Sequence, residues 1–115
     1  MKNQVAQLTK TEKAWVKSYR KALEKRYPDS VQKLLIYGSK ARGQAHAESD
    51  LDLLLIVRND AGALKRELRR VGYRLAATAE VLPSILAYTE QEWENRKASG
   101  STFRKAVERD AVRVV

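Results

Sequence analysis

The chain has 115 residues, of which 43% are hydrophobic and 32% charged, a balance typical of one folded domain rather than of a disordered chain. It has no cysteine and a single histidine, His46, which excludes disulfides, thiolate metal sites and sites built from several histidines. The net charge is +9, yet residues 34–63 carry three basic and four acidic side chains, so the centre of a basic chain is acidic.

The N-terminal residues lack the apolar run of a signal peptide, and no stretch of the sequence is apolar enough to span a membrane. We therefore expect a cytoplasmic protein and treat residues 1–115 as one domain.

The first helix is predicted by Thr9 and Glu12, which have the spacing of a capping box. Apolar side chains then recur at helical spacing until Pro28 ends the helix. Val31–Tyr37 is short, apolar and rich in β-forming residues, which predicts a strand.

The middle of the chain predicts a second strand, a helix and a third strand. Asp50–Val57 is apolar on both faces apart from its two aspartates, so this strand should be central. Leucines and Val71 at helical spacing predict an amphipathic helix over 64–75. Glu80–Tyr88 predicts a third strand, which either lies at an edge of the sheet or is broken at Pro83.

The last third begins with Thr89 and Glu92, a second capping box, and its helix is interrupted at Gly100. Another helix is predicted over Ser101–Asp110, followed by a short strand over Ala111–Val115. This order indicates an α/β (α+β) fold, with a small mixed sheet of about three or four strands packed by helices.

Asp50 and Asp52 are the first candidate functional residues. Because side chains alternate along a strand, both carboxylates should emerge on one face, about 7 Å apart. Two like charges on a buried strand repel each other unless basic side chains or a divalent cation neutralise them. Oxygen ligands without histidine or cysteine favour Mg²⁺ or Mn²⁺ over Zn²⁺.

Gly38 and Ser39 end the preceding strand and are the second candidate pair. A glycine there lets the backbone approach a ligand closely, and the turn and the Ser39 hydroxyl suit a phosphate. Lys40 and Arg42 can add positive charge to this turn. A phosphate-binding turn beside a metal-binding carboxylate pair is typical of a nucleoside triphosphate site.

The segment GSKARGQAHAESDLDLLLIV, residues 38–57, resembles the signature of the minimal nucleotidyltransferases of the polymerase-beta superfamily. The shared pattern is Gly-Ser, ten residues, then Asp-x-Asp. This resemblance implies a polymerase-beta-like fold and a nucleotidyltransferase domain over 1–115. It also implies transfer of a nucleoside monophosphate, most simply AMP from ATP.

The resemblance implies a role for each matching residue. Asp50 and Asp52 would be catalytic ligands of two Mg²⁺ ions, and Gly38 and Ser39 would contact the triphosphate. Arg42 and Ser49 are further candidates for nucleotide binding, although Arg42 could instead pair with Glu48. A third carboxylate completes such sites on a neighbouring strand, and Glu80 is the candidate, as a catalytic residue and metal ligand, although it could also be an ordinary surface residue.

Standalone domains of this kind resemble the antitoxins of prokaryotic pairs whose toxin is an all-helical HEPN protein. The resemblance therefore implies that the acceptor is a hydroxyl of such a partner. Two alternatives remain open. One is a module of the same fold that neutralises or scaffolds a partner by contact alone. The other is a nucleic-acid-binding protein, which the basic helices motivate.

Overall fold

The computed structural model of the chain describes residues 8–43 and 50–114. The helices are α1 (Lys10–Arg26), α2 (Ser39–Arg42), the 3₁₀ helix η1 (Asn59–Leu64), α3 (Lys65–Ala76), α4 (Glu90–Ala98) and α5 (Thr102–Asp110). The strands are β1 (Val31–Tyr37), β2 (Leu51–Val57), β3 (Pro83–Thr89) and β4 (Val112–Arg113).

The four strands form one mixed sheet in the order β3-β2-β1-β4. β1 runs antiparallel to both β2 and β4, whereas β2 and β3 are parallel. The predictions of a central second strand and of an edge strand containing Pro83 are confirmed, because β2 is interior and β3 lies at the edge. The predicted α/β (α+β) fold with a small mixed sheet is likewise confirmed.

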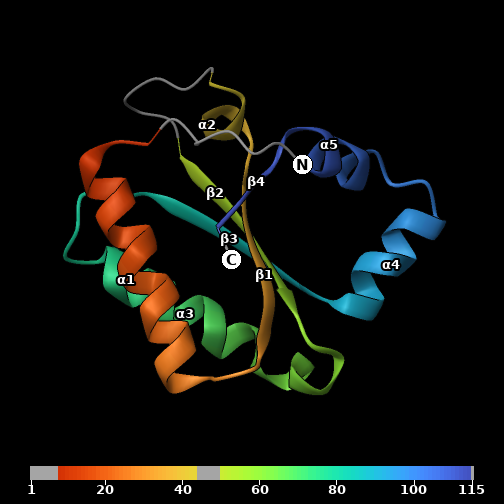
Figure 1. Cartoon of the computed structure of the whole chain (residues 1–115), viewed down its shortest axis with the longest axis horizontal. Helices are drawn as coiled ribbons and strands as arrows, with labels where there is room; N and C mark the ends of the chain where they lie inside the picture. The colour runs from red at the N-terminus through yellow and green to blue at the C-terminus, as the bar shows by residue number, and fades with distance from the viewer. Residues whose placement is uncertain (1–7, 44–49, 115) are drawn as a thin grey trace.

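Helices cover both faces of the sheet, with α1 and α3 on one side and α4 and α5 on the other (Figure 1). Because side chains alternate along β2, the strand contributes residues to two buried clusters, one on each face of the sheet. Leu53 and Leu55 pack with the first pair of helices, and Leu54 and Ile56 pack with the second. These four side chains are fully or almost fully buried, which explains why β2 is apolar on both faces.

The two helices of the first face are locked together where α1 crosses α3. The indole Nε1 of Trp15 donates to the Gly72 carbonyl at 3.1 Å, and the Tyr19 hydroxyl donates to the Leu68 carbonyl at 2.7 Å. A Cβ on Gly72 would lie 2.6 Å from Cδ1 of Ile85 and 2.9 Å from Cζ of Tyr19, so this contact requires glycine. The position of α3 on the sheet is therefore fixed from its inner face.

Both predicted capping boxes are present, at Thr9 with Glu12 and at Thr89 with Glu92. The third strand, however, begins at Pro83 rather than at Glu80. Residues 77–80 form turns that follow α3. One of the hydrogen bonds that hold them runs from the Ala79 amide to the Ala76 carbonyl, at 3.1 Å. Glu80 thus belongs to the connection after α3 and not to the sheet. Within residues 8–43 and 50–114, no helix has the length and apolar character needed to cross a membrane.

Candidate nucleotide site

Asp52 lies at the start of β2, directly beside the end of β1. Its register partner in β1 is Tyr37, so the two side chains emerge next to each other on the face that carries α4 and α5. Asp50 precedes β2 by one residue and is exposed, whereas Asp52 is partly buried. The antiparallel pairing of β1 and β2 brings the Gly38-Ser39 turn to the two aspartates, as expected if these strands are neighbours.

Gly38 approaches Asp52 more closely than any other residue type could. Its φ is +76°, and a Cβ at this position would overlap Oδ2 of Asp52 and lie 3.3 Å from Cγ. Both the backbone conformation and the close approach therefore require glycine. The carboxylate of Asp52 lies against the backbone of the turn that the sequence predicts to bind phosphate.

The two aspartates repel each other electrostatically, and this repulsion affects the pKa of Asp52. Burial and the neighbouring Asp50 charge raise the pKa of Asp52, and Arg42 acts in the opposite direction. Burial and the charge of Asp52 also raise the pKa of Tyr37, to about 12. A cation at this position would remove the repulsion between the two aspartates.

The two basic residues of the turn have different surroundings. Arg42 is exposed at the end of α2, and its positive charge acts to lower the pKa of Asp52. Lys40, in contrast, is 3% exposed, and its Nζ donates to Oε1 of Glu12 at 2.9 Å. The expectation that Lys40 adds charge to the turn is wrong, because its ammonium group is turned inward and paired with α1.

A cavity of about 210 Å³ adjoins the site between the end of β1 and α5. It is lined by Tyr37, Gly38, Arg42, Phe103, Ala106, Val107 and Asp110. The rings of Tyr37 and Phe103 meet edge to face, with their centroids 5.4 Å apart. Sequence reasoning missed this cavity. Tyr37 directly before the Gly-Ser turn was the local signal, whereas Phe103 and Ala106 arrive only through the packing of α5 on β1.

The other candidate residues lie apart from this group or outside the described residues. Ser49, a candidate for nucleotide binding, lies outside the described residues. Glu80 is exposed, three residues before β3 begins. The β3 residue in register with Asp52 is Ser84. Within the part of the chain that the structure describes, no three acidic or histidine side chains are grouped as a metal site would need.

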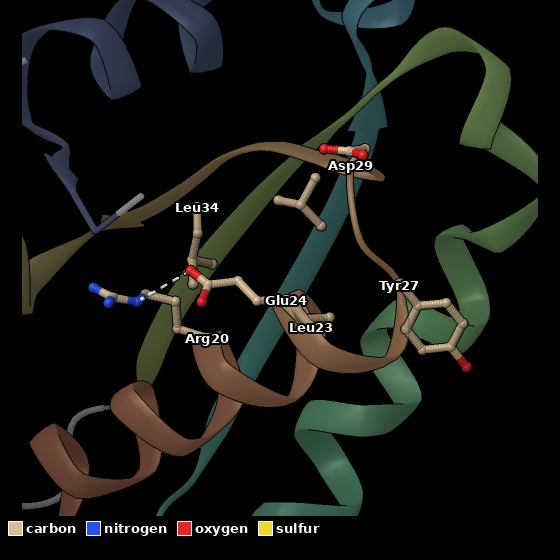
Figure 2. A pocket seen from close by; sticks show the side chains of 7 residues that line it. Arg20, Leu23, Glu24, Tyr27, Asp29 and Leu34 are labelled. Carbon is tan, nitrogen blue, oxygen red and sulfur yellow. Dashed lines mark ion pairs between the residues drawn. The ribbon is translucent and has the colours of Figure 1, made fainter.

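A second, smaller cavity lies at the opposite end of β1, where α1 ends (Figure 2). Figure 2 shows Leu23 and Leu34 beside the ion pair of Arg20 and Glu24, which are 3.5 Å apart. Its volume of about 50 Å³ is far below the few hundred cubic ångströms of small-molecule sites. The cavity near Asp52 is therefore the better candidate for a ligand.

Comparison with known proteins agrees with this geometry. The sequence matches the nucleotidyltransferase domain family over residues 16–110, and the chain belongs to this family. Its fold is similar to the crystal structure of a proposed nucleotidyltransferase from Sulfolobus solfataricus, with a TM-score of 0.56 and 17% identity, covering 87% of this chain and 76% of the other. The curated proteins include no match to the sequence. Family membership implies a nucleotide substrate and a general role in nucleotidyl transfer.

Proposed function

We propose that this protein transfers a nucleoside monophosphate, most simply AMP from ATP, to a hydroxyl group of a partner macromolecule. The observation that carries the proposal is the contact between Gly38 and Asp52. It places a glycine turn suited to phosphate against a pair of carboxylates. The chain belongs to the nucleotidyltransferase family, and such a turn and carboxylate pair suit a triphosphate and a divalent metal.

The residues present fit a magnesium ion. Asp50 and Asp52 offer carboxylate oxygens, and Mg²⁺ in phosphate-transfer sites is commonly held by one or two carboxylates together with substrate phosphates and water. The absence of a side chain at Gly38 leaves the space that Oδ2 of Asp52 occupies beside the turn. Bound Mg²⁺ would supply positive charge that neutralises the phosphates and stabilises the departing pyrophosphate.

The residues of the chain would bind and orient the two ends of the nucleotide. Gly38 and Ser39 would hold the phosphates next to Asp52, with Arg42 adding positive charge. The nucleoside would occupy the adjoining cavity, against the rings of Tyr37 and Phe103. A cavity of about 210 Å³ suits a base rather than a whole triphosphate, so the phosphates would lie outside it, along the turn.

For the acceptor, we propose a helical toxin of the HEPN class, with this protein as its antitoxin. The support is the likeness of residues 38–57 to the minimal nucleotidyltransferases of such pairs. A tyrosine hydroxyl of the partner suits the chemistry, because its proton is the most easily removed among the common side-chain hydroxyls.

A second candidate function is a module that binds its partner without transferring a nucleotide. The favouring observation is the register of β3, which places Ser84 rather than an acidic residue beside Asp52. Glu80, the expected third carboxylate, lies in an exposed turn outside the sheet. Inhibition of the partner would then need neither ATP nor the two aspartates.

The experiment incubates the purified protein with Mg²⁺, α-labelled ATP and a HEPN-type partner. The test variant is Asp50→Asn/Asp52→Asn. A matched control, Asp29→Asn/Asp60→Asn, removes two exposed carboxylates elsewhere. Label on the partner with the wild type and the control, but not with the test variant, supports transfer. Inhibition of the partner without label, retained in the test variant, supports the binding module instead.

A further inference from the structure

The outer face of α3 gathers positive charge in a hollow. Arg66, Arg69, Arg70 and Tyr73 recur at helical spacing and together line a cavity of about 300 Å³. Arg66 and Arg70 are exposed. The one acidic residue of the helix, Glu67, pairs with Arg70 at 3.6 Å. We call these four residues the α3 hollow.

Arg69 in this hollow has an unmet hydrogen-bonding group. Its Nε is buried and has no hydrogen-bond partner within the described residues. Buried polar side-chain atoms nearly always have a partner, so an orphaned guanidinium nitrogen calls for an explanation. An anion that draws this side chain outward would supply the missing acceptor, and the two neighbouring arginines already favour an anion there.

Tyr73 places an exposed aromatic ring in the α3 hollow, and its hydroxyl is hydrogen-bonded. The residue is 43% exposed, and among the described residues only it and Leu82 are large hydrophobic residues with such exposure. Its hydroxyl accepts a hydrogen bond from the Ile85 amide at 2.9 Å, which ties the ring to the outer edge of β3. Because Trp15 and Tyr19 bond to backbone carbonyls of α3, the helix that carries the ring and the arginines is held on the sheet.

We propose that the α3 hollow binds single-stranded nucleic acid, with the arginines on phosphates and Tyr73 stacking on a base. Guanidinium groups pair with phosphate oxygens in a planar, two-pronged geometry, and exposed aromatic rings accept any base. An acidic protein segment would use the arginines but would have no need of an exposed aromatic ring. The α3 hollow shares no residue with the cavity beside Asp52, so the inference does not depend on nucleotidyl transfer.

The test measures the affinity of the full chain for a fluorescent single-stranded RNA of about 12 nucleotides by anisotropy over a range of salt concentrations. The variant Arg66→Ala/Arg70→Ala should weaken binding about tenfold or more and should reduce the slope of log K against log salt by about 1.4. Both side chains are exposed, so the fold should survive, which circular dichroism checks.

Two matched comparisons make the result specific. Lys13→Ala/Lys17→Ala removes the same charge from exposed positions of α1 and should change affinity and slope far less. Tyr73→Phe and Tyr73→Leu both lose the bond to Ile85, but only the second loses the ring, so only it should weaken binding about tenfold. Equal losses from the arginine and lysine variants would overturn the proposal. Equal displacement of the RNA by polyglutamate would also overturn it, since the surface would then recognise charge alone.

Discussion

The Nζ of Lys40 lies 2.9 Å from both Oε1 and Oε2 of Glu12, and both side chains are almost fully buried. Glu12 also closes the capping box of α1 by accepting a hydrogen bond from the Thr9 amide at 2.9 Å. One carboxylate thus joins the first turn of α1 to α2, which begins directly after Gly38. This pair fixes the turn on which the proposed phosphate site depends.

Replacing Lys40 by Met should destabilise the protein by about 3 kcal/mol, because it leaves the Glu12 carboxylate buried without its partner. Urea unfolding measures the loss. The double variant Glu12→Gln/Lys40→Met keeps a capping residue and leaves no buried charge, so it should be less destabilised than the sum of its single variants. Strict additivity would contradict the coupling of these two residues.

Much of the fold could be predicted because its signals are local. The two capping boxes mark the starts of α1 and α4, and Pro83 marks an edge strand. The doubly apolar run of β2 follows from helices on both faces of the sheet. Each of these features depends on residues close together in the chain.

The failures depend on long-range packing. Glu80 looked like a strand residue because apolar residues follow it, yet the turns after α3 extend through it. Lys40 was expected to add positive charge to the turn, but its ammonium group pairs with Glu12, 28 residues away in sequence. The cavity beside Asp52 needs Phe103 and Ala106 from α5, and no local pattern links them to β1.

Gly38→Ala should abolish the binding of Mg²⁺ and ATP, because the new methyl group would overlap the Asp52 carboxylate. It should also cost about 2 kcal/mol, because φ +76° with ψ −158° lies in a region that essentially only glycine adopts. Gly100→Ala is the matched control, since Gly100 has φ +74° and no atom within 4 Å of its Cβ position. It should lose some stability through its positive φ and keep ATP binding, both measurable by calorimetry. Loss of binding in both variants would show that strain, and not contact with Asp52, is responsible.

Ala106→Phe should fill the cavity beside Tyr37 and exclude the nucleoside. The affinity for ATP should fall about tenfold or more, the scale of a lost base–aromatic contact. The affinity for Mg²⁺ with tripolyphosphate, which has no nucleoside, should stay close to the wild-type value. Titration calorimetry with both ligands distinguishes a nucleoside pocket from a general loss of the site, in which both affinities would fall.

Glu92 should make the stability depend on pH in the acid range. Hydrogen bonds from Lys65 and from the Thr89 backbone hold the pKa of Glu92 below its ordinary value of 4.5. The folded state therefore gains stability above pH 4.5 and loses it as the pH falls through the lowered value. Glu92→Gln keeps the capping box but not the charge, so its melting temperature should lie below that of the wild type at pH 7 and converge with it in acid. A constant difference from pH 7 to pH 3 would show that charge is not the cause.

Ser84→Asp should complete the carboxylate group at Asp52. Ser84 is the register partner of Asp52, and the neighbouring positions of its face, Leu86 and Tyr88, pack on the same side of the sheet as Leu54. A third carboxylate there should lower the melting temperature without metal, because three like charges repel, and should increase the stabilisation that Mg²⁺ gives. The control Ser84→Asn, similar in size but uncharged, should show neither change in a thermal melt. If Mg²⁺ failed to stabilise Ser84→Asp beyond the wild type, Asp52 would not be part of a metal site.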